Sequence, residues 1–190
     1  RFGQPLASGK GDFLQRRKLD KGAIAIEETV RFFAVDGLQQ ALPDARIVSG
    51  ASVVRGCRMI KTPAELALMQ LAADIQIAAF RHVAPRIERG MSQQDIQAML
   101  IAASRALGGE TDGGLILIGE SSAYPHGSHI PRRVADGEVI LFDAGVTVHG
   151  YQSDISRTMV FGRTADTKQR LLFDQVRRGQ DIAMDTARVG

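Results

Sequence analysis

The chain has 190 residues, of which 44% are hydrophobic and 24% are charged, and its formal net charge is +3 at pH 7. This composition excludes a disordered chain, and no apolar run is long enough to cross a bilayer as a helix. The basic residues are scattered in pairs without interleaved aromatic residues, so we expect neither a nucleic acid nor a membrane as a partner.

The first part of the chain predicts a short α/β region. Residues 22–27 are mostly apolar and predict a buried strand, and residues 45–48 predict another short strand. Between them, residues 29–42 predict a helix that Pro43 ends.

Two amphipathic helices are predicted next. The run Thr62-Pro63-Ala64-Glu65 has the pattern of a capping box with a proline at the first helical position. Apolar residues then repeat at helical spacing, at Leu68, Leu71, Ile75 and Ala79. The second helix begins at Ser92 and ends at Gly108-Gly109, and its apolar residues are Ile96, Met99, Leu100, Ala103 and Leu107. We expect both helices to face a core.

Strands dominate the stretch that follows. Residues 115–118 predict one strand, and apolar residues on both sides of His149-Gly150 predict a hairpin. A last helix is marked by Leu172, Phe173, Val176 and Ala183. Helices on one side of a mainly antiparallel, curved sheet define the α+β class, which is the fold class that we predict.

The hairpin brings two aspartates together. Gly150 supplies the positive φ that a tight turn needs, and a two-residue turn at His149-Gly150 pairs Asp143 with Ser156. Because residues two apart on a strand share a face, Asp154 is expected on the same face as Asp143. Diagonal neighbours of this kind lie roughly 7–8 Å apart, close enough to hold a cation between their side chains.

Two other interpretations of these aspartates stay open at this point. Aspartate is common near turns, so both side chains are expected to be solvated in the simplest case. Alternatively, Arg157 forms an ion pair with Asp143. Because Asp143 follows an apolar run, we expect its side chain against a core, where an unpaired carboxylate would be costly.

Three motifs in order carry a family resemblance. Pro125-His126-Gly127 is followed by a strand with Asp143-Ala-Gly and then by Gly150-Tyr-Gln-Ser-Asp154-Ile-Ser-Arg-Thr. This series resembles the pita-bread metallopeptidases: Xaa-Pro dipeptidase (prolidase), Xaa-Pro aminopeptidase and, more distantly, methionine aminopeptidase. The junction at residues 60–65 favours the Xaa-Pro branch.

The resemblance implies an incomplete pita-bread (creatinase/aminopeptidase) fold, preceded by the end of an α/β domain. Residues 1–57 would then be the C-terminal part of an N-terminal creatinase/prolidase-like domain, and residues 58–190 the first part of the metallopeptidase catalytic domain. It also implies a homodimer. The single Cys57 favours a reducing setting, so we expect a cytoplasmic protein.

The same resemblance implies the chemistry. Two divalent metal ions would be bound, with Asp143 a ligand of one and Asp154 bridging both; oxygen ligands favour Mn²⁺, with Co²⁺ or Zn²⁺ as alternatives. His126 would be the catalytic histidine that contacts the substrate. Water activated by the metals would then hydrolyse the Xaa-Pro bond of a proline-containing dipeptide or peptide. We expect a dipeptidase first and an aminopeptidase second.

The chain departs from the family by an absence. The family site also needs a third-ligand histidine and two glutamates downstream, and no histidine follows His149. We therefore expect a fragment with little activity by itself. The alternatives are a non-catalytic pita-bread module that binds peptides or proteins and a metal-free creatinase-like C–N hydrolase. Both are disfavoured by the intact aspartates.

The other histidines stay outside the predicted site. His129 follows His126 in the same loop, but no motif supports a role for it. His149 is expected at the tip of the hairpin, and His82 within a helix. Tyr151 is expected to be structural, packing at the edge of the hairpin.

Overall fold

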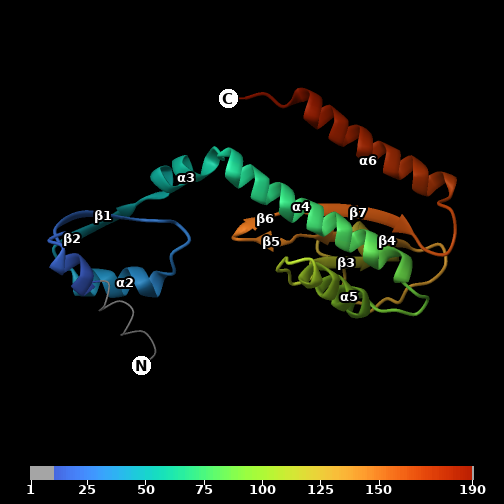
Figure 1. The fold of residues 1–190 in the computed structure, drawn as a ribbon, viewed down its shortest axis with the longest axis horizontal. Helices are drawn as coiled ribbons and strands as arrows, with labels where there is room; N and C mark the ends of the chain where they lie inside the picture. Colours follow the sequence, from blue (N-terminus) through green and yellow to red (C-terminus); the bar gives the residue numbers. More distant parts are fainter. Residues whose placement is uncertain (1–10, 190) are drawn as a thin grey trace. The chain divides into compact units, whose positions relative to one another are not determined.

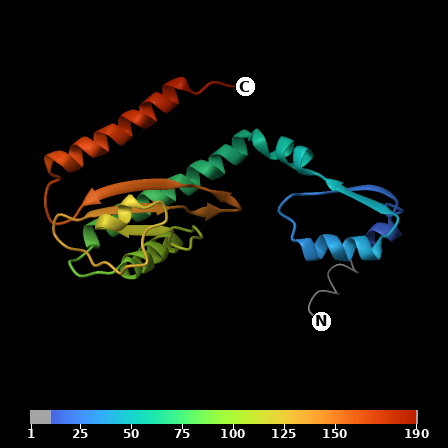
Figure 2. The ribbon, with the colours of Figure 1, turned by 180° about the vertical axis from the view of Figure 1, so that it is seen from behind.

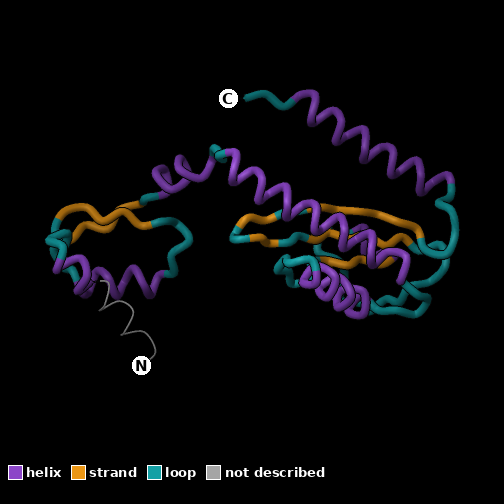
Figure 3. The backbone as a smooth tube through the Cα atoms, viewed as in Figure 1, coloured by secondary structure: helices purple, strands orange, loops and turns teal. Residues whose placement is uncertain are grey.

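The computed structural model describes residues 11–189, and the chain divides into two compact units, Arg1–Thr62 and Pro63–Gly190. Figure 1 labels their helices and strands, and Figure 3 colours them by type. The expected division between residues 57 and 58 lies inside a helix, and the assignment of residues 1–57 to a further domain stays a prediction. None of the described helices is long and apolar enough to cross a membrane.

The first unit holds a small parallel sheet with helices. Its elements are β1 (Gly22–Ile26), α2 (Phe32–Ala41), β2 (Ala45–Ser49) and α3 (Ala51–Met59). The two strands pair in parallel, with Gly22 opposite Ala45, and their core is built on Leu38 and Leu42. The prediction of strands on either side of a helix is confirmed, but β1 was expected to be buried and none of its residues is. Because β1 pairs with only one other strand, this small sheet leaves most of β1 exposed.

The second unit contains a three-stranded antiparallel sheet, covered on one face by two helices (Figures 1 and 2), and a two-stranded sheet. Its elements are α4 (Pro63–Val83), the 3-10 helix η1 (Ala84–Arg86), α5 (Gln93–Ala106), β3 (Leu115–Ile118), the 3-10 helix η2 (Gly119–Ala123), β4 (Val139–Ala144), β5 (Thr147–Val148), β6 (Tyr151–Gln152), β7 (Ile155–Val160) and α6 (Thr167–Thr186). The strand order is β3-β4-β7 in the larger sheet, and β5 pairs with β6 in the smaller one. The helices and strands predicted for this region are all present, and the antiparallel pairing is as predicted.

Side chains along β4 point alternately to the two faces of the larger sheet. Ile140, Phe142 and Ala144 point into the core that α4 and α5 cover, while the residues between them are half-buried on the other face. The ring of Phe142 lies 5.3 Å from that of Phe80 on α4. Leu71 was predicted to face this core, but it is 46% exposed. The predicted Ile75 and Ala79 are buried, and the buried stripe of α4 also includes Ala72, Phe80 and Val83. Leu107 was predicted to face the core as well, but it follows the last turn of α5 and is 47% exposed.

Capping explains where two helices begin. The hydroxyl of Ser92 accepts from the backbone of Asp95 while the Asp95 carboxylate accepts from the backbone of Ser92, which is a capping box at the start of α5. Asp166 and Gln169 form the equivalent box at α6. No residue of α6 is buried.

Candidate functional site

The hairpin has the predicted register. Val148 pairs with Tyr151, and Asp143 pairs with Ser156. The two turn residues, His149 and Gly150, have φ of 47° and 85°. Positive φ at both central positions is the requirement of the type I′ turn, whose twist matches that of the flanking strands. The turn thus sets which residues face each other around Asp143.

Asp143 lies on the sheet face that the helices do not cover. Its neighbours Phe142 and Ala144 are buried in the core, so its own side chain points the opposite way and is half-buried. The expectation that it sits against the core is therefore wrong, because the alternation of β4 directs it to the open face. The Ser156 hydroxyl donates to Asp143 Oδ1 at 2.8 Å. This bond orients the carboxylate and leaves Oδ2 available to a ligand.

Asp154 lies where the strand pairing of the hairpin is interrupted, between β6 and β7. The interruption is held by Ser153, whose hydroxyl accepts from the Val146 N–H at 3.0 Å and whose own N–H donates to the Val146 carbonyl at 2.9 Å. A Cβ at Gly145 would collide with the Ser153 carbonyl oxygen. Glycine at 145 therefore permits the close approach that sets the backbone before the exposed Asp154.

Both aspartates line one cavity of about 890 Å³. Its wall also contains Glu110, Asp112 and Arg105, so four carboxylates outweigh one guanidinium. A hollow lined mainly by one sign of charge attracts the opposite sign, here cations. Among the residues that the structure describes, no group of three or more histidine, cysteine, aspartate or glutamate side chains could hold one metal ion. The chain thus supplies the two predicted aspartates without a third ligand beside them.

Sequence reasoning missed the segment that forms the far wall of this cavity, residues 110–114. Glu110 pairs through its backbone with Thr147, and the Thr111 hydroxyl donates to the Gly145 carbonyl at 2.7 Å. The two glycines at 108 and 109 were the only local signal, since they ended the preceding helix. The pairing with a hairpin more than thirty residues later has no local signature.

Arg157 does not form the ion pair that was considered for it. Its guanidinium donates to the Ser156 carbonyl at 2.7 Å, and no ion pair with Asp143 or Asp154 is found within residues 11–189. Since it is adjacent to Ser156, its side chain leaves the strand on the opposite face from Asp143. The arginine in the cavity is Arg105, which forms no ion pair with a described carboxylate either.

His126 lies in the loop between β3 and β4 and is exposed. It is not one of the residues that line the cavity. The next residue, Gly127, has φ of 77°, and a Cβ there would lie 2.6 Å from Leu117 Cδ2. Leu117 pairs with Leu141, and Leu115 pairs with Asp143, so all four side chains share one face. The loop therefore crosses the face that carries Asp143, and His129, also exposed, lies in the same loop.

Tyr151 is structural, as expected. Its hydroxyl donates to Glu65 Oε1 at 2.8 Å and so connects the hairpin to the first turn of α4. His149 is at the hairpin tip, and His82 is exposed in the last turn of α4. The capping box predicted at Thr62 stays a prediction.

The sequence matches the model of metallopeptidase family M24 over residues 67–190. It is 27% identical over 169 residues to the Xaa-Pro dipeptidase of Pyrococcus furiosus, covering 88% of this chain and 48% of that protein. It is 28% identical over 184 residues to the Xaa-Pro dipeptidase of Lactobacillus helveticus, covering 94% of this chain and 50% of that protein. The chain thus spans about half the length of the curated relatives it matches.

Solved structures agree. A dipeptidase from Pyrococcus horikoshii superimposes with a TM-score of 0.83 at 26% identity, covering all of this chain and 53% of that one. The X-Pro aminopeptidase of Thermotoga maritima gives a TM-score of 0.73 at 28% identity, covering 85% of this chain and 46% of that one. The pita-bread fold class expected from the motifs is confirmed, over part of its length.

Proposed function

Since the chain belongs to metallopeptidase family M24, we propose that the protein hydrolyses Xaa-Pro peptide bonds with two bound divalent metal ions. The observation that carries this proposal is the position of Asp143 and Asp154 on one cavity with an excess of carboxylates. The names of the relatives, two of them Xaa-Pro dipeptidases, support the substrate class.

The donor set fits a hard or borderline cation. Carboxylate oxygens suit Mn²⁺ best among the candidates, with Co²⁺ or Zn²⁺ as alternatives. Asp143 would hold one ion through the oxygen that Ser156 leaves free, and Asp154 would bridge both. When bound, two such metal ions would supply an activated water and polarise the scissile carbonyl. The remaining ligands would have to come from outside this chain, so residues 1–190 alone should have little activity.

The residues of the chain then have separate tasks. The hydrogen bond from Ser156 orients the Asp143 carboxylate, as outer partners of metal ligands commonly do. His126, on the loop over the same sheet face, would donate a hydrogen bond to the substrate carbonyl oxygen as charge develops on it, or move a proton to the leaving nitrogen. Its exposure here leaves the imidazole accessible to a substrate.

The test is a peptide assay on the full-length protein with Mn²⁺. We expect release of proline from Ala-Pro and slower cleavage of Ala-Pro-Ala, because a dipeptidase is our first choice. Faster cleavage of the tripeptide would identify an aminopeptidase. Absence of both cleavage and Mn²⁺ uptake would refute the proposal and favour a binding module; metal-free hydrolysis of another C–N bond would favour a creatinase-like enzyme.

We also propose that the protein is a cytoplasmic homodimer. The exposed thiol of Cys57 is compatible with a reducing compartment. Phe32 and Phe33 expose large apolar surfaces of the kind that subunit contacts bury. Light scattering on the full-length protein should give twice the monomer mass, and a monomer at micromolar concentration would contradict this part of the proposal.

A further inference from the structure

The loop that carries His126 is long. It spans residues 119–138, from the end of β3 to the start of β4, and only its first turn is helical. Loops of this length without regular structure are uncommon in compact domains and are usually functional. The His126 side chain has no hydrogen-bond partner among residues 11–189, so the position of the imidazole depends on how the loop backbone is held.

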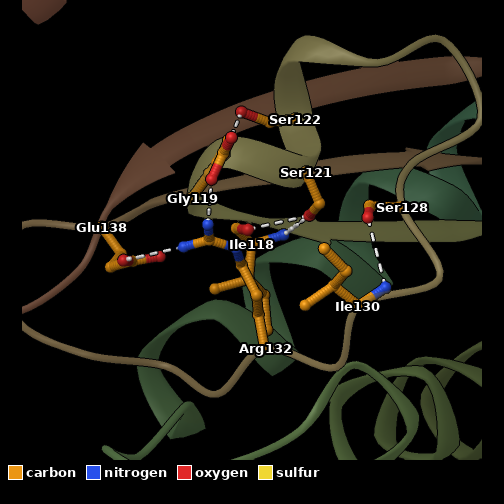
Figure 4. Close-up of polar contacts among 9 residues, drawn as sticks. Ile118, Gly119, Ser121, Ser122, Ser128, Ile130, Arg132 and Glu138 are labelled. Atoms are coloured by element: carbon orange, nitrogen blue, oxygen red, sulfur yellow. Dashed lines mark hydrogen bonds and ion pairs between the residues drawn. The ribbon is translucent and has the colours of Figure 1, made fainter.

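Arg132 joins both ends of this loop (Figure 4). Nη2 of its guanidinium contacts the Glu120 carboxylate in η2, at the start of the loop. The other nitrogen, Nη1, lies 3.7 Å from Glu138 Oε1, at the end of the loop. The Arg132 and Glu138 side chains are only 31% and 27% exposed, so solvent screens this pair less than it screens most surface pairs.

The position of Glu138 explains why the arginine is needed. Its Oε2 is buried without a hydrogen-bond partner, and a Cβ at Gly119 would collide with that oxygen. Arg132 is the one cation that pairs with Glu138 in the described part of the chain. Without it, a partly buried carboxylate would be left uncompensated, which is costly.

Other hydrogen bonds also hold parts of the loop. The Ser121 hydroxyl accepts from the Ile118 N–H and donates to the Ile118 carbonyl, both at 2.8 Å, and the Ser122 hydroxyl donates to the Gly119 carbonyl at 2.7 Å. These bonds act only at the first turn. Between that turn and Arg132, the Gly127 N–H donates to the Tyr124 carbonyl at 3.1 Å and the Ile130 N–H donates to the Ser128 hydroxyl at 3.2 Å, and both contacts are internal to the loop. After Arg132, an isolated bridge pairs Arg133 with Ser92, which holds the last part of the loop.

From this arrangement we infer that Arg132 is a positioning residue for His126. It ties the part of the loop around residue 132 to Glu120 and Glu138 at the two ends of the loop, which the pairing of Ile118 with Ile140 brings together, and this clamp keeps His126 over the sheet face that carries Asp143. The inference rests on the proposed function for the role of His126, while the clamp itself rests only on the contacts of Arg132.

The test compares Arg132→Gln with the wild type in the full-length protein. We expect backbone amide exchange of residues 121–130 to rise about tenfold, because a network pair at a half-buried site is lost. The kcat for Ala-Pro should fall about tenfold with a smaller change in KM. Arg132→Lys keeps the positive charge but cannot contact both glutamates through two guanidinium nitrogens, so its amide exchange and kcat should lie between those of the wild type and Arg132→Gln.

Glu120→Gln provides a second variant that should fold, because that side chain is 67% exposed. It should loosen the loop less than Arg132→Gln, and the two changes should not be additive. The matched control is Arg55→Gln, which removes an exposed Arg–Glu pair with Glu28 in the other unit. It should change neither the exchange of residues 121–130 nor kcat.

Unchanged exchange of residues 121–130 in Arg132→Gln would overturn the clamp. Faster exchange with an unchanged kcat would overturn the positioning of His126. A wild-type protein without peptidase activity would refute the proposed function, and faster exchange in Arg132→Gln would then still support the clamp.

Discussion

Removing the Ser156 hydroxyl tests whether Asp143 is a metal ligand oriented by its neighbour. Ser156→Ala deletes the 2.8 Å hydrogen bond to Asp143 Oδ1 and nothing else that the structure describes for that side chain. A hydrogen bond to a charged group contributes roughly 1.5–3 kcal/mol. Because Ser156 is exposed and Asp143 half-buried, we discount this to about 1 kcal/mol.

About 1 kcal/mol corresponds to a roughly fivefold weaker Kd for Mn²⁺. The assay is isothermal titration calorimetry of Mn²⁺ into the full-length protein. Ser156→Thr, which keeps the hydroxyl, should bind as the wild type does. The matched control is Ser49→Ala, which removes a hydroxyl that accepts from the Ala51 N–H in the first unit. A Kd unchanged in Ser156→Ala, or weakened equally in Ser49→Ala, would refute the reasoning.

Two further predictions concern the scaffold of the site. Gly145→Ala should lower the free energy of unfolding by about 1–3 kcal/mol, because its Cβ collides with the Ser153 carbonyl; an unchanged urea midpoint would contradict this. The backbone N–H of Ser92, and then its hydroxyl, hold the pKa of Asp95 below its ordinary 3.8. The capping box should therefore stabilise the fold above pH 3.8 and lose this contribution as the pH falls through the lowered pKa. Asp95→Asn should have a shallower acid limb in urea melts from pH 7 to 2, and an identical limb would count against the box.

Local signals were sufficient for the hairpin. His149-Gly150 has the residue types of a tight turn, and once the turn is placed, strand alternation determines that Asp143 faces Ser156. The start of α5 was equally predictable, because Ser92 and Asp95 form the reciprocal hydrogen bonds of a capping box within four residues. These features depend on neighbours in sequence, so one sequence suffices to predict them.

Other features depend on contacts that are distant in sequence. The burial of Asp143 was misjudged because an apolar run does not tell which face of the sheet the helices cover. The cavity wall at residues 110–114 depends on the hairpin, and α3 was missed because its cap, Gly50, makes no side-chain hydrogen bond. The Arg132 clamp joins residues 12 positions apart through charge, and arginine pairs on surfaces are too common to single it out.

Direct titration of the metal site is the most decisive measurement. Full-length wild-type protein, Asp143→Asn and Asp154→Asn should be titrated with Mn²⁺ by calorimetry, with circular dichroism as the check on folding. We expect two ions per wild-type chain and a loss of affinity of at least about 100-fold in each variant, with unchanged helical content. Wild-type affinity and stoichiometry in both folded variants would contradict it.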